Sequence, residues 1–362
     1  MTRFIAARLL QGFLVMLGVS VLVFFLFQLV RFNPAYALAG EAASTETVAN
    51  ISRELGLDRP VGAQLLTHLN NLSPLSRHAL DPAARNYLEP GSVKALTIFS
   101  GTSHRWVLKY PYLGRSFQSG RPVASLLNAT IPNTLLLALT AMMFATFCGI
   151  ILGMLAAMQQ GSWLDRSITA GSVMGIALPS FFAAILLQLI FAYLLSSFTG
   201  LKMTGNLYEA DEYTGQIYLS LRNLILPAIA LGIRPVAVIT QITRSSMLDV
   251  LHADYIRTAR AKGLGSGAVV YRHALKNALI PVITSVTGWL ASLLAGAFFI
   301  EVVFNYNGLG LETVNAIKTK DIPVATGAVL YIALVFVLVN MLTDILYGLA
   351  DPRVKMSSKQ AS

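Results

Sequence analysis

Charged side chains are scarce in this chain of 362 residues: they make up 12% of the sequence, whereas apolar residues make up 55%. Soluble domains carry about 25% charged residues, so this composition argues against a soluble globular protein. Cysteine is scarcer still, because Cys148 is the only one. A single cysteine excludes an intrachain disulfide and leaves the redox compartment undetermined.

The residue patterns of several enzyme classes are also missing. No glycine is followed by lysine, which excludes the GxxxxGK[ST] loop that holds ATP in P-loop proteins. The five histidines are scattered without the spacing of a zinc site, and no GxSxG nucleophile motif occurs. We therefore expect no catalytic residue, no metal site and no cofactor. Glu301 and Asp344 end apolar runs, where we expect carboxylates solvated at the level of the lipid headgroups.

The chain does contain apolar runs of the length that a bilayer requires, about 20 residues. The first, residues 9–30, holds 22 uncharged residues between Arg8 and Arg31. Five further runs lie at residues 131–157, 168–198, 224–243, 277–300 and 322–343. The sequence therefore predicts an all-α polytopic membrane protein with six transmembrane helices.

A cleaved signal peptide is the alternative explanation of the first run. Arg3 and Arg8 form a basic start, and Ala37-Leu38-Ala39 is similar to a cleavage site. The run is longer than the usual apolar region of roughly 7–15 residues, and the site lies well beyond its end. We therefore expect the run to remain as a membrane helix.

Lys and Arg near the ends of the runs predict the orientation, because cytoplasmic flanks carry the excess. With the N-terminus inside, twelve lie in inner segments: Arg3, Arg8, Arg166, Arg244, Arg257, Arg260, Lys262, Arg272, Lys276, Arg353, Lys355 and Lys359. Four lie in the two short outer loops: Lys202, Arg222, Lys318 and Lys320. We therefore expect cytoplasmic N- and C-termini. We attribute the net charge of +10 to this orientation rather than to nucleic-acid binding.

The segment between the first two runs differs in composition. Residues 32–121 carry charges, prolines and asparagines and no run that could span, which predicts an extended periplasmic insertion after the first helix. Residues 56–69 predict a helix that begins near Asp58, whereas the later part up to Tyr110 shows no interpretable pattern. The expected domains are the N-terminal transmembrane helix (1–31), the extracytoplasmic domain (32–121), the membrane core (122–350) and a cytoplasmic tail (351–362).

A basic, polar island, residues 249–281, separates two apolar runs. Three of its residues share one narrow helical face: Tyr255, Ile256 and Ala259. Three glycines then interrupt the helix: Gly263, Gly265 and Gly267. Glycine weakens helices and takes positive φ freely, so the chain is expected to turn there. A second helical pattern begins at Ala268. The island therefore predicts a helix, a glycine corner and a helix on the membrane surface, placed to dock a partner.

Small residues spaced four apart let helices approach closely in lipid. Two such pairs occur, Gly149 with Gly153 and Gly171 with Gly175, although either one alone can arise by chance in glycine-rich membrane helices.

Arg234 lies near the middle of the fourth run and precedes Pro235. A charge at that depth is costly unless it faces water or a partner, so Arg234 is a candidate for the translocation path. The alternatives are pairing with a carbonyl freed by a proline kink, or snorkelling from a tilted helix.

The island also carries a family resemblance. RTARAKGLG (257–265) followed by YRHALKNALIP (271–281) resembles the cytoplasmic EAA loop of binding-protein-dependent ABC importer permeases, in the dipeptide/oligopeptide/nickel branch. Further matching stretches are MTRFIAARLLQG at the start, YLGRSFQSGRPVASLL (112–127), LPSFFAAILLQLIFA (178–192), TRSSMLDVL (243–251) and EVVFNYNGLG (301–310). Together they resemble the B-type permease subunit over nearly the whole chain.

The resemblance implies a multi-pass permease in the bacterial inner membrane that imports short peptides and is not itself an enzyme. Its implied partners are a homologous C-type permease in a heterodimer, cytoplasmic ABC ATPase subunits and an extracytoplasmic solute-binding protein. The residues expected to couple to the ATPase are Arg257, Thr258, Ala259, Ala261, Lys262, Gly263 and Leu264.

Two departures from the family pattern lie in segments expected outside. Phe32-Asn33-Pro34 stands where Gly-Asp-Pro is usual, and Asn305-Tyr306-Asn307 stands where Ser-Trp-Pro is common. Because of these departures, the resemblance does not determine which solute-binding protein docks or which solute is imported. Import of nickel or of another small solute on the same scaffold stays open. A self-sufficient secondary transporter would require ion-relay carboxylates near the midplane, and none occurs in the runs.

Overall fold

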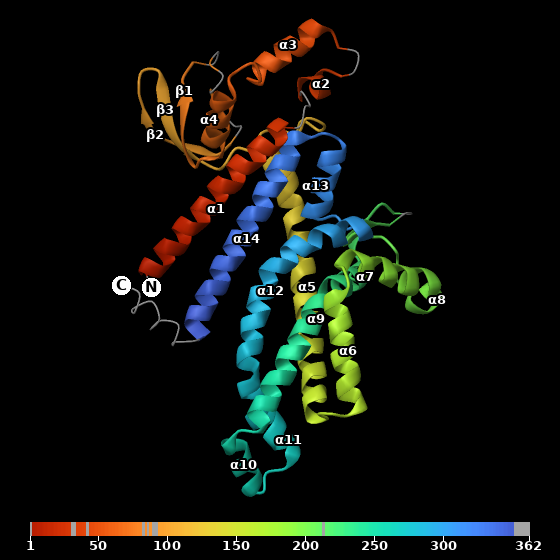
Figure 1. Cartoon of the computed structure of the whole chain (residues 1–362). Coiled ribbons are helices and arrows are strands. Elements are labelled where there is room, and N and C mark those ends of the chain that lie inside the picture. Colours follow the sequence, from red (N-terminus) through yellow and green to blue (C-terminus); the bar gives the residue numbers. More distant parts are fainter. Residues whose placement is uncertain are drawn as a thin grey trace. The chain divides into compact units, whose positions relative to one another are not determined.

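The computed structural model describes residues 2–29, 34–40, 43–81, 84, 87–88, 93–211 and 214–350 (Figure 1). The helices before residue 200 are α1 Thr2–Leu29, α2 Pro34–Ala39, α3 Thr45–Glu54, α4 Val61–Leu72, α5 Val123–Met158, α6 Trp163–Ala177, α7 Ser180–Leu187, the π-helix Gln188–Leu194 and α8 Ser196–Thr199. Those after it are α9 Arg222–Leu251, α10 Asp254–Ala261, α11 Ser266–Ala268, the π-helix Val269–Ala274, α12 Leu275–Phe304, α13 Leu309–Lys318 and α14 Ile322–Ala350. The chain is mostly helical, as predicted. The predicted tail, residues 351–362, lies outside the described residues.

Two small antiparallel sheets correct the expectation of an all-α chain. One has the strand order β1–β3–β2, with β1 Leu75–Ala79, β2 Ala95–Ser100 and β3 His104–Lys109. The other pairs β4 Tyr208–Ala210 with β5 Ile217–Leu219. The first sheet occupies the stretch before Tyr110 that gave no pattern. Every residue of β2 is exposed, so the alternation of apolar and polar residues by which a half-buried strand is recognised is missing.

Among the described residues, five helices are long and apolar enough to cross a membrane: Ala6–Leu29, Val123–Met158, Arg222–Leu251, Ser266–Phe304 and Ile322–Asp344. They match five of the six predicted runs. The other predicted run, 168–198, is not one straight helix, because α6 and the segment Ser180–Leu194 meet at an angle of 110°. The described part of the chain therefore has five candidate spans, or six if this bent pair counts as one.

Pro179 explains the bend. The residue before a proline is pushed from helical to extended backbone, and Leu178 has φ −71° and ψ 127°. Pro179 then stands at the N-terminal boundary of α7 with φ −62°. The apolar composition of residues 168–198 concealed a break that this single residue marks.

By internal contacts the chain divides into two compact units, residues 1–130 with 312–335 and residues 131–311 with 336–362. In the first unit, α4 packs on α1: the His68 Nε2 atom lies 3.2 Å from Ser20 Oγ, and its ring lies 5.6 Å from the Phe24 ring. Burial lowers the pKa of His68, which favours the neutral imidazole.

A buried carboxylate joins two distant segments of the first unit. Asp321, next to the start of α14, accepts hydrogen bonds from Ser116 Oγ (2.5 Å) and from the Phe117 backbone N–H (3.1 Å). The loop that leads into α5 is thereby tied to α14.

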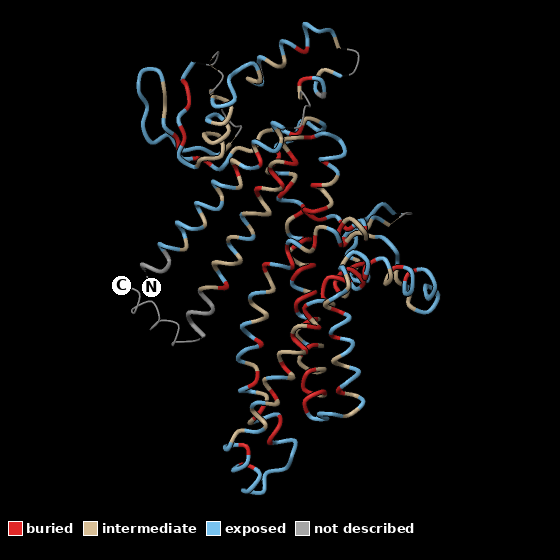
Figure 2. Tube along the Cα trace, viewed as in Figure 1, coloured by how far each residue is buried: buried red, intermediate tan, exposed pale blue. Residues whose placement is uncertain are grey.

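The second unit is built around α9, which packs against α6, α7 and α12. Buried residues gather along it in Figure 2. The first glycine pair permits close packing with α5: a Cβ atom on Gly149 would lie 2.7 Å from Ile239 Cγ2, and one on Gly153 would lie 2.6 Å from the Thr240 carbonyl oxygen. The prediction is therefore confirmed for this pair. Of the second pair, Gly175 approaches α9, with a Cβ 3.2 Å from Ala237 Cβ, whereas Gly171 faces open space.

This difference provides a matched test. Gly153→Ala is expected to lower the free energy of unfolding by about 1–3 kcal/mol, because the added methyl group forces α5 away from α9. Gly171→Ala has room, and alanine favours helix over glycine by up to about 1 kcal/mol, so no loss is expected there. Thermal unfolding of the purified variants in detergent compares them. Equal losses in the two variants would contradict the packing described for α5.

Candidate docking site

The corner predicted at residues 249–281 is formed by α10, α11 and the π-helix Val269–Ala274 that leads into α12. Helix α10 begins after Ala253, whose backbone is extended, with Asp254 in its first turn. It ends at Ala261, and Gly263, two residues later, has φ +76°, the left-handed conformation that glycine adopts freely. The chain then reverses, as the sequence predicts. Gly265 and Gly267 are not needed for the turn, since neither has a positive φ.

Helix α10 is seated on the end of the membrane bundle through two buried residues. Ile256 is fully buried and Ala259 is 7% exposed. They belong to an apolar cluster, here called the corner seat, whose other buried members are Met154, Ala157, Met247, Val269, Val270, Ala274 and Ala278. The ends of α5, α9 and α12 all contribute to it. Burying an isoleucine side chain stabilises by about 1.5–3 kcal/mol, so α10 is held firmly against the bundle.

A hydrogen bond reinforces this seat, because Asn277 Nδ2 of α12 donates to the Tyr255 hydroxyl at 2.8 Å. Tyr255 is itself 43% exposed, so of the three residues expected on the apolar face only Ile256 and Ala259 are buried.

The opposite side of α10 and the corner are exposed. Six of the seven residues expected to couple to an ATPase lie there: Arg257, Thr258, Ala261, Lys262, Gly263 and Leu264. The seventh, Ala259, points into the corner seat, so its small side chain serves packing within the chain. The Arg257 side chain is 78% exposed, with only a 3.7 Å contact to the exposed Asp254. The exposed surface of the corner is therefore basic, with Leu264 as an exposed apolar residue.

An open groove of ≈ 460 Å³ lies beside α10. It is lined by Ala157, Met158, Gln159, Gln160, Ser162, Leu248, Leu251, His252 and Arg260. The groove extends the exposed surface of the corner onto the turn between α5 and α6.

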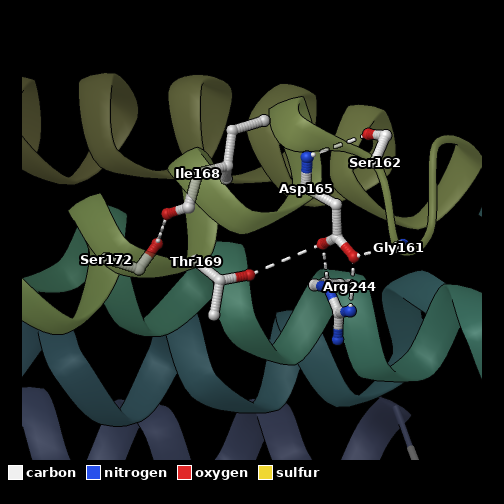
Figure 3. Close-up of polar contacts among 7 residues, drawn as sticks. All are labelled: Gly161, Ser162, Asp165, Ile168, Thr169, Ser172 and Arg244. Atoms are coloured by element: carbon white, nitrogen blue, oxygen red, sulfur yellow. Dashed lines mark hydrogen bonds and ion pairs between the residues drawn. The ribbon is translucent and has the colours of Figure 1, made fainter.

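The sequence reasoning missed an ion pair near this end of the bundle. Arg244 lies in the C-terminal part of α9, and the sequence alone indicates for it only a role in orientation. Its Nε and Nη2 atoms donate to the two carboxylate oxygens of Asp165 in α6, at 2.5 and 2.8 Å (Figure 3). Asp165 also accepts from the Gly161 backbone N–H at 2.9 Å, and its side chain is 5% exposed. The pair fastens α6 to α9.

Glu301 is the second residue that the sequence placed wrongly. It is fully buried at the end of α12, not solvated at the headgroup level. Its carboxylate accepts from Thr134 Oγ1 (2.6 Å) and from the backbone N–H groups of Gly310 (2.6 Å) and Leu311 (3.2 Å). The two N–H groups belong to the first turn of α13 and have no acceptor within that helix, and a negative charge is stabilised at such a helix start. A Cβ atom on Gly308 would collide with the carboxylate. The glycines of the Asn-Gly-Leu-Gly stretch are therefore the sequence feature that indicates a close approach of Glu301.

Arg234 is exposed on α9. Two turns further along the same helix lies Ile242, which borders an open groove of ≈ 540 Å³ between α9 and α12. The other residues of this groove are Pro281, Thr284, Ser285, Gly288, Trp289 and Ser292. Arg234 is not among the lining residues of this groove, so the structure shows only that its side chain is exposed.

Residues 149–356 match the family described as "Binding-protein-dependent transport system inner membrane component", and residues 1–81 match the N-terminal family of such membrane components. A putative peptide transport system permease protein of Brucella abortus is 37% identical over 356 residues, which cover 98% of this chain and 99% of the relative.

Two further relatives carry the name dipeptide transport system permease protein DppB. That of Alkalihalophilus pseudofirmus is 34% identical and covers 98% of this chain and 100% of the relative. That of Escherichia coli is 33% identical and covers 98% and 99%. The extent of these matches, together with the apolar spans, shows that the chain belongs to the family of binding-protein-dependent transport system inner membrane components.

Proposed function

We propose that this chain is the membrane permease subunit of an ATP-driven importer of short peptides. The relatives named above support this substrate class, because they are peptide and dipeptide transport permeases over almost their whole length. As a member of its family the chain is a multi-pass protein of the inner membrane that works with other transporter components, and ATP hydrolysis belongs to a separate subunit.

The corner carries the proposed mechanism. An ATPase with an acidic groove docks on the exposed side of α10, where Arg257, Arg260 and Lys262 supply positive charge. Because Ile256 is fully buried in the corner seat, a displacement of α10 carries α5, α9 and α12 with it as one body. The proposed transport cycle is a switch between two such arrangements, driven by ATP binding and reset by hydrolysis.

The proposed topology follows from the charge of this end of the bundle. Arg166, Arg257, Arg260, Lys262 and Arg272 gather at the end where the corner lies, which supports a cytoplasmic location. Residues 32–121 then form an extracytoplasmic domain between the N-terminal helix (1–31) and the permease core (122–350), and residues 351–362 form a cytoplasmic tail.

The open groove between α9 and α12 supports a pore made by two chains. A homologous C-type permease covers this face, and Arg234 lines the path between the subunits, where a positive charge interacts with the terminal carboxylate of a peptide. An extracytoplasmic solute-binding protein delivers the peptide and sets most of the selectivity.

Uptake by the complete transporter tests the proposal. The chain, a C-type permease, the ATPase subunits and the binding protein are reconstituted in vesicles, and accumulation of labelled di-, tri- and pentapeptides and of chelated nickel is measured with and without ATP. ATP-dependent accumulation of at least one peptide class is expected. Uptake by the chain alone, or accumulation of nickel with no peptide, would overturn it.

A further inference from the structure

The sheet β1–β3–β2 has one covered face and one open face. Ser76, His78 and Val107 are buried on the covered face, at 1%, 2% and 1% exposure. The residues on the open face are apolar and exposed: Leu75 (51%), Leu96 (72%), Phe99 (64%), Trp106 (42%) and Leu108 (48%). These five residues are called the apolar sheet face. Figure 2 shows the hairpin of β2 and β3 exposed over most of its length.

The strand register makes this face continuous. Leu108 of β3 stands between Leu75 of β1 and Leu96 of β2, and Trp106 stands between Arg77 and Phe99. Cross-strand neighbours on one side of a sheet lie about 5 Å apart, so the row of three apolar side chains and the pair Trp106–Phe99 form a single patch, with Arg77 at its edge. Soluble surfaces seldom leave a contiguous apolar patch uncovered, and this one therefore requires an occupant.

The first unit itself indicates which occupant this is. Helix α4 is bound to β1, because the Asn70 side chain exchanges two hydrogen bonds of 3.0 Å with the backbone of Arg77, and Lys109 Nζ of β3 donates to the Asn71 carbonyl at 2.5 Å. The other side of α4 contacts the spanning helix α1 at Ser20 and Phe24.

The position of this contact along α1 indicates how close α4 lies to the membrane. Ser20 precedes Leu29, the last residue of α1, by nine residues, which is about 14 Å along the axis at 1.5 Å per residue. The α4 scaffold is therefore attached to α1 within its apolar span Ala6–Leu29 rather than beyond its end, which ties the sheet fixed to α4 to a helix long and apolar enough to cross the bilayer.

We propose that the apolar sheet face docks on the membrane itself, in the leaflet at the C-terminal end of α1. The residue types fit a lipid surface: tryptophan is enriched at membrane interfaces, leucine and phenylalanine insert into the acyl region, and the neighbouring Arg77 is placed to meet lipid phosphates. The segment after the first span is then a membrane-resting domain, held by lipid independently of any partner protein.

Trp106 is the natural probe of this contact. In the full chain with Trp163→Phe and Trp289→Phe, Trp106 is the sole tryptophan. The chain is reconstituted alone in vesicles of phosphatidylethanolamine and phosphatidylglycerol, and Trp106 emission is quenched either by lipids brominated on the acyl chain or by aqueous acrylamide. Strong quenching by brominated lipid with weak quenching by acrylamide is expected. Leu96→Glu should abolish lipid quenching, whereas Thr97→Glu, on the opposite side of the same strand, should preserve it.

A second measurement does not depend on the tryptophan variants. Leu96→Cys or Thr97→Cys, each with Cys148→Ala, is labelled with a polarity-sensitive fluorophore in the same vesicles. A blue-shifted emission is expected at residue 96 but not at residue 97. Aqueous emission from residue 96 in vesicles overturns the proposal, as does protection that occurs only when a solute-binding protein or a second permease is added, since a protein would then be the occupant.

Discussion

Replacing Asp165 by alanine is expected to destabilise the chain by about 3–5 kcal/mol, the usual cost of leaving the other charge of a buried ion pair without its partner. The pair joins α6 to α9 through two hydrogen bonds of 2.5 and 2.8 Å, and Asp165 is almost fully buried. Without Asp165, the Arg244 guanidinium has no carboxylate partner at the packed face of α9, where the Arg244 side chain is only 28% exposed. Thermal unfolding in detergent, calibrated by chemical denaturation, measures the effect.

The control is a double-mutant cycle. Adding Arg244→Met to Asp165→Ala removes the stranded charge and should recover much of the loss, because replacement of both members of a buried pair by apolar groups is often neutral. Thr169→Val removes only the 3.5 Å contact of Thr169 Oγ1 with Asp165 and should cost far less. A double variant as unstable as Asp165→Ala alone would show that the ion pair is not what fastens these helices.

Reversing the charge of the corner is expected to abolish ATP-driven uptake while the chain remains folded. Arg257→Glu with Lys262→Glu places two negative charges on a surface proposed to meet an acidic groove. Both side chains are exposed and neither contributes to the corner seat, so stability should not change. Binding of the ATPase should weaken by at least about tenfold, which corresponds to 1.4 kcal/mol.

The matched control reverses a charge at the other end of α9. Arg222→Glu is also an exposed substitution of arginine by glutamate, and an acidic residue is favourable at a helix N-terminus. Co-purification of the ATPase and peptide uptake are compared for both variants. If the corner variant retains the ATPase, or if Arg222→Glu loses it equally, then docking is not at the corner.

Much of the membrane architecture was predictable because length and apolarity alone determine whether a helix can span. The turn at Gly263 was predictable for a similarly local reason, since few residues other than glycine adopt its φ of +76°. Composition failed at Pro179, where one residue breaks an otherwise apolar run. It also failed at β2, whose apolar residues do not alternate with polar ones.

The remaining errors concern partners that are distant in sequence. Asp165 and Arg244 are separated by 79 positions, and Thr134 and Glu301 by 167, so nothing in the local pattern of either residue indicates its partner. A carboxylate at the end of an apolar run is by itself compatible with solvent or with burial. Only the fold shows that Glu301 lies within reach of the first N–H groups of α13.

Because α12 is one continuous helix, it connects Glu301 mechanically to the corner. Its 30 residues extend about 45 Å, from Leu275 beside the corner to Phe304 next to the α13 turn. One extremity is clamped by the apolar cluster under α10, and the other by a carboxylate that holds the start of α13. A displacement of the inner end therefore has an unbroken helical path to the far side of the bundle, and Pro281 is the one proline along it.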